Sequence, residues 1–391
     1  MDTTQRLIIA LMKAAVTGEA QPLSQGYSLE EAMPIIKKQG LATLAYEGGV
    51  LCGFSPKDPN MQELFKIYCQ ILFRSERQMR KVEEVFQAFE ENSIDYLPFK
   101  GCVIKSLYPR PELRTMSDAD ILIRAEQYES IVPIMKMLDF QLTLAEESVM
   151  TWSHKDLCVE LHRNFYAPAD EDLFVYHENV WQQVIKQTCF RYSLSKEDTF
   201  LHLFTHFVKH YRSSGVGIKH VLDLWVFRCS NPDMDEAYVA QELTKLQMKE
   251  FYENVLRLLE YWFSNGTQDD IISLMTEWIF SLGTFNPSES SEMFKTLREI
   301  ELLRGRKNAR LQYYRRVLFP ALRIVQVKYP FLKKFPWLLP VAWVLRGIDV
   351  LLYKRRKIEK IVRTGKSISD EELSNRKQAL EFVGLGFHKN N

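Results

Sequence analysis

Two aspartates separated by one residue are the part of this sequence best suited to chemistry. Asp118 and Asp120 lie in the segment Ser-Asp-Ala-Asp-Ile-Leu-Ile, where acidic and apolar residues alternate. On a β-strand alternate side chains share a face, so both carboxylates would project together. Like charges this close are costly unless a cation neutralises them. The pair therefore predicts a site for Mg²⁺ (or Mn²⁺), which binds carboxylate and phosphate oxygens.

A third acid and a lysine could complete such a site. Glu160 lies between Val159 and Leu161, so a strand here would point Glu160 and His162 to one side. If this strand lies beside the aspartate strand, Glu160 could complete the cation site or take a proton from an attacking hydroxyl. Lys100-Gly101 is expected to end a strand and open a helix, where a phosphate could approach the backbone.

The order of these motifs resembles the uncharacterised nucleotidyltransferase family of the polymerase-beta-like superfamily. It includes Phe-Lys-Gly at 99–101, Leu-Tyr-Pro at 107–109, Arg-x-x-x-Asp-x-Asp at 114–120 and an acid-Leu-His strand at 160–162. The resemblance implies an α+β fold, with an α/β core built on a mixed sheet and helices on both sequence sides. It also implies catalytic and metal-binding residues Asp118, Asp120 and Glu160, and nucleotide-binding residues Lys100, Gly101 and Arg114. Ser117, next to Asp118, is a further candidate for nucleotide binding.

The resemblance continues more weakly into a His-x-x-x-His and Leu-Asp-Leu pattern. Substrate contacts are implied there and on the third strand, by His162, His206, His210 and Asp223. The sequence departs from the superfamily pattern at three points. Its turn reads Lys-Gly-Cys, 16 residues separate Gly101 from Asp118, and Glu160 stands where aspartate is more usual.

Several of these residues have structural interpretations as well. Arg114 could clamp a phosphate, or it could pair with Asp118 or a helix C-terminus. Ser117 could contact phosphate or make a turn hydrogen bond. His162 could orient a carboxylate or act as an acid or base.

Three histidines, His202, His206 and His210, recur at four-residue steps and so lie near one helical face. A zinc site is one interpretation, but it would lack a carboxylate or thiol to complete it. Packing against the catalytic region, with His206 or His210 reaching substrate, is the favoured interpretation.

The periodicity of apolar residues divides the chain into four regions: helical residues 1–92, a catalytic core over 93–195, a helical domain over 196–303, and a basic, proline-punctuated region over 304–391. The strands expected in the core are 95–99, 119–123, 140–144 and 157–162, with a helix over 126–138. The helices expected elsewhere are 6–16, 29–38, 60–92, 197–211, 217–228, 237–245, 249–263, 271–280 and 370–383.

Charge is distributed unevenly along the 391 residues. The chain has a formal charge of +1, yet residues 304–366 hold 18 basic and two acidic side chains, and the remainder carries a net −15. Together with Trp337 and Trp343, this basic region suits an anionic membrane surface or a phosphorylated acceptor more than RNA, since no RNA-binding module is evident. Docking onto the acidic remainder of the chain is the simplest alternative.

Together with these patterns, the family resemblance implies a bacterial, metal-dependent enzyme that moves a nucleotidyl group from a nucleoside triphosphate such as ATP to an unidentified acceptor. A small molecule, glycan precursor or peptide is a better candidate than RNA. The alternatives are transfer of a sugar or another group by the same fold, and a non-catalytic protein that binds through its basic region. Six scattered cysteines and the absence of a signal-like start favour a cytoplasmic protein, with peripheral contact at the inner membrane face.

Overall fold

The computed structural model describes residues 1–23, 26–145, 148–167, 170–212, 215–282, 331–353 and 370–386, and single positions 319, 322, 325 and 329. The chain divides into two compact units. The first contains residues 1–207 and 216–285, and the second contains residues 208–215 and 286–391. The division of the chain into the four regions given above remains a prediction.

Four helices precede the sheet: α1 (Thr3–Thr17), α2 (Leu29–Gln39), α3 (Ala42–Leu51) and α4 (Pro59–Glu91). The predictions of α1, α2 and α4 are confirmed, and Asp2, Ser28 and Asp58 cap them by accepting backbone N–H groups. The predictions missed α3, whose sequence contains Gly48-Gly49. A side chain at Gly48 would place its Cβ 2.0 Å from the Leu11 carbonyl oxygen, so glycine is what lets α3 lie directly against α1.

A mixed sheet of five strands follows, in the order β1-β2-β5-β4-β3. Only the pairing of β2 with β5 is parallel, and Pro98 lies in β1 at the sheet edge, where a missing N–H is tolerated. The expected mixed sheet with helices on both sequence sides is thus confirmed. The strands are β1 (Tyr96–Phe99), β2 (Asp118–Ile123), β3 (Gln141–Ala145), β4 (Val149–Ser153) and β5 (Cys158–His162).

The predictions within the core differ from the structure in two elements. β4 was not predicted, although Met150 and Trp152 are buried and alternate with partly buried residues. The predicted helix over 126–138 begins as a 3₁₀ turn and becomes α6 (Ile131–Met137) only two residues before Pro133, where proline is tolerated because it lies in the first helical turn. The helix expected to open at Lys100-Gly101 is present as the short α5 (Gly101–Ile104). Short elements not predicted are α7 (Glu171–Tyr176) and the hairpin of β6 (Ile185–Lys186) with β7 (Tyr192–Ser193).

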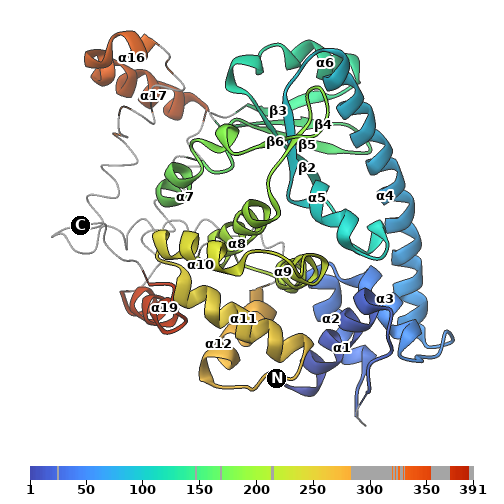
Figure 1. Ribbon diagram of the computed structural model, residues 1–391. Helices are drawn as coiled ribbons and strands as arrows, with labels where there is room; N and C mark the ends of the chain where they lie inside the picture. Colours follow the sequence, from blue (N-terminus) through green and yellow to red (C-terminus); the bar gives the residue numbers. More distant parts are fainter. Residues whose placement is uncertain are drawn as a thin grey trace. The chain divides into compact units, whose positions relative to one another are not determined.

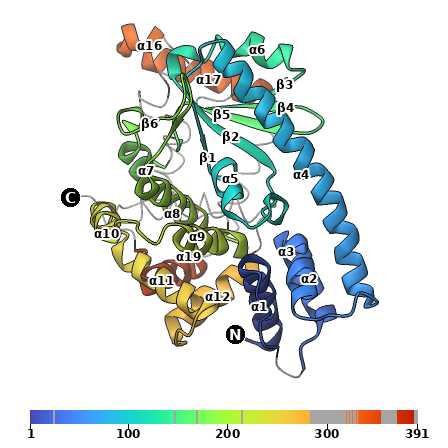
Figure 2. The ribbon, with the colours of Figure 1, turned by 45° about the vertical axis from the view of Figure 1, so that its right-hand side comes forward.

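The long helix α4 covers one face of the sheet (Figure 1) and continues past it to the N-terminal helices. At 33 residues it is about 50 Å long. Its residues Val85 and Phe89 share a buried core with Ala119 and Ile121 of β2. Because side chains alternate along a strand, Asp118 and Asp120 project from the opposite face. Figure 2 shows the same arrangement from a second direction.

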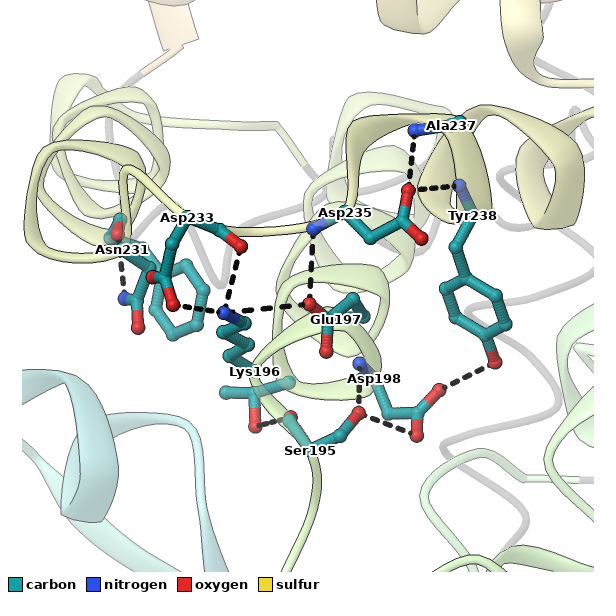
Figure 3. Close-up of polar contacts among 11 residues, drawn as sticks. Ser195, Lys196, Glu197, Asp198, Asn231, Asp233, Asp235, Ala237 and Tyr238 are labelled. Carbon is teal, nitrogen blue, oxygen red and sulfur yellow. Dashed lines mark hydrogen bonds and ion pairs between the residues drawn. The ribbon is translucent and has the colours of Figure 1, made fainter.

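Five longer helices lie within residues 196–282, and their predictions are confirmed within a few residues: α8 (Lys196–Arg212), α9 (Ile218–Ser230), α10 (Glu236–Lys245), α11 (Lys249–Phe263) and α12 (Asp270–Leu282). Figure 3 shows how the start of α8 is tied to the turn before α10. Lys196 Nζ donates to the Asp233 carbonyl oxygen at 2.8 Å, and the Asp235 N–H donates to Glu197 Oε1 at 3.1 Å. These contacts fix the direction of α8 as it leaves the sheet region.

In the second unit the structure describes α16 (Phe331–Lys334), α17 (Leu339–Tyr353) and α19 (Asp370–Phe382). The last of these confirms the helix predicted over 370–383. Within the described residues no helix is both long and apolar enough to cross a membrane. Much of the basic region, including Lys354–Lys357, lies outside the described residues.

Candidate active site

The parallel pairing of β2 with β5 brings the predicted carboxylates together. Asp120 lies directly opposite Glu160 in the register of the two strands, and Asp118 precedes Asp120 on the same face. His162, two residues after Glu160, places its Nε2 2.9 Å from Asp120 Oδ1 and 3.4 Å from Glu160 Oε2. Acids separated by 40 residues in the sequence therefore meet at one point of the sheet.

Asp120 is the most strongly held of these acids. Its side chain is buried, and Lys100 Nζ donates to its Oδ1 at 2.6 Å. Burial by itself would raise the pKa of Asp120, but Lys100 and His162 outweigh it and hold that pKa well below its ordinary value. Asp120 is consequently ionised at physiological pH.

Asp118 is in the opposite electrostatic situation. Burial, followed by repulsion from Asp120 and Glu160, raises the pKa of Asp118, although Ser117 Oγ donates to its Oδ1 at 2.8 Å. Ser117 thus donates its hydroxyl hydrogen bond to one of the carboxylates of the site. These acids therefore repel one another, and a divalent cation bound among them would neutralise that repulsion.

The donor groups at this point suit a metal ion. Ligand atoms of Asp120, Glu160 and His162 all lie within 4.8 Å of one another. Carboxylate oxygens suit Mg²⁺ or Mn²⁺, while an imidazole nitrogen is also a ligand for other divalent metals. Lys100 at present supplies the positive charge beside Asp120.

The Lys100-Gly101 turn has a defined conformation. Lys100 adopts a positive φ of 50°, its ammonium group contacts Asp120 of β2, and Gly101 begins α5. A Cβ on Gly101 would lie 3.0 Å from Met116 Cγ, so the absence of a side chain allows close packing against the segment before β2. The helix opened here is only four residues long, which limits the contribution of its dipole to anion binding.

Arg114 has a structural partner that the sequence did not reveal. Its guanidinium donates Nε and Nη2 to the Asp223 carboxylate at 2.7–3.1 Å, and Tyr108 donates its hydroxyl to the same carboxylate at 2.8 Å. The structural interpretation given above predicted that Arg114 pairs with Asp118 or with a helix C-terminus, whereas the carboxylate that it contacts is that of Asp223. The reason is tertiary, because Asp223 lies on α9, 109 residues away.

His202 and His206 have different neighbours, although both lie on α8. His202 is buried between the rings of Phe99 and Phe165, and neither of its ring nitrogens has a hydrogen-bond partner among the residues that the structure describes. Burial lowers the pKa of His202 well below its ordinary value, so the ring is neutral. The His206 ring centroid lies 5.9 Å from that of His220 on α9. His210 lies farther along α8, in the second compact unit.

Two lysines near the site, the partly buried Lys219 and the buried Lys105, were not singled out from the sequence. Lys219 Nζ donates to the Thr115 carbonyl oxygen at 3.4 Å, and burial, with the charge of Arg114, lowers the pKa of Lys219 to about 7. Lys105 Nζ donates to the Arg114 carbonyl oxygen at 3.0 Å. Both lysines therefore hold the segment that leads into Asp118. A lysine among apolar residues was the only signal in the sequence, and it is a weak one.

The chain is similar to a known family in its sequence and to a solved structure in its fold. The model of the uncharacterised nucleotidyltransferase family matches residues 28–264. No curated protein matches the chain. Among solved structures, the chain is similar to the solution structure of the antibiotic-resistance factor ANT(2'')-Ia, with 14% identity over 48% of this chain and 97% of that one, and a TM-score of 0.34. The family match spans more than half of the residues and includes every acid of the site, so this chain belongs to the uncharacterised nucleotidyltransferase family and to the nucleotidyltransferase class of enzymes.

Proposed function

We propose that this enzyme transfers a nucleotidyl group from a nucleoside triphosphate to an acceptor in a reaction that depends on Mg²⁺ or Mn²⁺. The observation that carries the proposal is the in-register meeting of Asp120 with Glu160, beside Asp118 and Lys100. Asp118, Asp120 and Glu160 hold the metal, which supplies charge neutralisation at the phosphates when it is bound.

The chain's own residues have separate roles in this proposal. Asp120 stays ionised because Lys100 and His162 stabilise its charge. Lys100 and the backbone at Gly101 contact the phosphates, and Ser117 orients Asp118 through the hydrogen bond to its carboxylate. Glu160 completes the metal site or takes the proton of the acceptor. Arg114 and Asp223 act on substrate through the position of the loop that they brace.

The acceptor that we propose is a small molecule, glycan precursor or peptide. The decisive experiment incubates the protein with labelled ATP, GTP, CTP and UTP and with small-molecule, peptide and RNA fractions of its host. Label in a small-molecule or peptide fraction supports the proposal, whereas label in RNA overturns the choice of acceptor. Transfer of a labelled sugar in place of the nucleotidyl group would favour the alternative activity of the same fold.

Metal dependence is tested by the melting temperature of the protein with Mg²⁺ and each nucleotide. We expect an increase with at least one nucleotide, and its loss in Asp120→Asn. Asp233→Asn is a matched control, because Asp233 is exposed and lies outside the site. If no nucleotide raises the melting temperature, and the double variant Asp118→Asn with Asp120→Asn keeps full activity in cells, the protein acts by binding alone.

The second unit supports a separate proposal, peripheral contact with an anionic membrane surface on the cytoplasmic side. Phe335, Trp337 and Val344 are exposed by 42%, 73% and 63% in the segment that contains η5 (Pro336–Leu338) and α17. The surrounding residues 304–366 carry a net charge of +16. Apolar side chains beside basic ones favour an anionic interface. We expect the protein to sediment with vesicles containing phosphatidylserine at low salt, and less of Trp337→Ser to do so; no sedimentation would rule this contact out.

A further inference from the structure

A cavity of about 300 Å³ lies between α2, α4 and the segment that leads into Asp118. Its apolar lining includes Ile67 and Ile71 of α4, and its polar lining includes Gln78, whose Nε2 donates to the Met116 carbonyl oxygen at 3.1 Å. This volume is at the lower end of the range for small-molecule sites. α4 covers the sheet face opposite the carboxylates, so the cavity is separate from the candidate active site.

The charges that line the cavity are all positive. Lys37, Arg74 and Lys105 contribute to its wall, and none of the described residues that line it is acidic. Lys37 is paired with Glu63 at 2.6 Å, where both side chains are about half exposed. Arg74 is exposed and has no ion pair among the described residues. The cavity therefore has an excess of positive charge that its own lining does not balance.

Lys105 is the most informative of these residues. It is only 1% exposed, yet its ammonium group has one hydrogen-bond acceptor among the described residues, the Arg114 carbonyl oxygen, and no carboxylate contact. An ammonium group carries three donors, and a buried lysine ordinarily has an acidic partner. Burial, together with the nearby charge of Arg114, lowers the pKa of Lys105 to about 8. An anion in the cavity would supply the charge that Lys105 lacks.

From these observations we infer that the cavity is a binding site for a small organic anion, a carboxylate or phosphate monoester with an apolar body. The apolar body packs against Ile67 and Ile71, and the anionic group faces Lys105, with Arg74 nearby. The two sources of such an anion, a carboxylate and a phosphate, share this chemistry. The inference depends on the cavity and not on the transfer reaction, so it stands or falls independently of the proposed function.

The test measures binding of phenyl phosphate, of benzoate and of neutral benzyl alcohol to the full chain by saturation-transfer NMR titration. We expect saturable binding of at least one of the two anions, and binding of benzyl alcohol that is about tenfold weaker or more, since a charged hydrogen bond is lost. Stronger binding of phenyl phosphate would indicate a phosphate ligand, and stronger binding of benzoate a carboxylate ligand. Anion binding weakens as the pH rises above about 8, because the lysine then loses its proton.

Three variants locate the site. Lys105→Met removes the charge, and Ile71→Trp fills the cavity without altering Lys105; each weakens anion binding about tenfold or more. Lys66→Met is the matched control, since Lys66 is an exposed residue of α4, and it leaves binding unchanged. If Lys105→Met does not fold, Ile71→Trp decides by itself. The inference is overturned if neither anion binds saturably, or if binding is the same in Ile71→Trp as in the unaltered protein.

Discussion

The buried ion pair of Arg114 with Asp223 allows a quantitative test of how the structure holds the segment before Asp118. The two side chains are 11% and 6% exposed, and three guanidinium contacts of 2.7–3.1 Å join them. The change Asp223→Asn keeps the shape of the side chain but leaves the Arg114 charge unpaired. Removing one partner of a buried pair costs about 3–5 kcal/mol, and we expect about 3 kcal/mol because asparagine still accepts a hydrogen bond.

The assay is urea unfolding followed by circular dichroism and by tryptophan fluorescence, since coincident curves test whether one transition describes both. The matched control is Glu253→Gln, which breaks an exposed pair with Lys249 and is expected to change the free energy of unfolding by less than about 0.5 kcal/mol. A double variant, Arg114→Met with Asp223→Leu, should lose less stability than Asp223→Asn, because it leaves no buried charge unpaired. A loss in Asp223→Asn no larger than that in Glu253→Gln would refute this reasoning.

Three further predictions concern other parts of the first unit. Asp118→Asn should raise the free energy of unfolding of the metal-free protein at pH 7, because it removes a carboxylate whose pKa is raised by burial and neighbouring acids; no change in urea unfolding would contradict this. Gly48→Ala should lower the free energy of unfolding by about 1–3 kcal/mol, because the new Cβ would clash with backbone atoms of Leu11. Gly49→Ala should lower it less in the same assay, because its Cβ would contact only the flexible end of a methionine side chain. His202 is buried and its pKa is lowered, so its ring stays neutral in the folded protein while the same ring in the unfolded chain takes up a proton below about pH 6.5. The free energy of unfolding therefore falls as the pH drops below about 6.5, and this fall should be smaller in His202→Phe. Identical pH profiles of the two proteins would argue against this assignment.

The sequence determined the elements and the chemistry carried on them. Alternation of acidic and apolar residues placed Asp118 and Asp120 on one face of a strand, and the helices before and after the sheet followed from periodicity and capping residues. Such local patterns are set by residues a few positions apart, so they can be seen in one chain. The short helix α3 was not predicted, because a pair of glycines ordinarily indicates a turn. In this protein Gly48 instead allows α3 to pack closely against α1.

Tertiary structure decided which distant groups meet. The parallel pairing of β2 with β5 set Glu160 opposite Asp120, and the packing of α9 set Asp223 against Arg114. No local pattern encodes the partner of a buried charge, because it is chosen by the way remote elements pack. The same holds for Lys105, an ordinary lysine in the sequence that the fold places in a buried wall beside a cavity. The sequence by itself therefore determined which residues could do chemistry, and only the fold decided which of them act together.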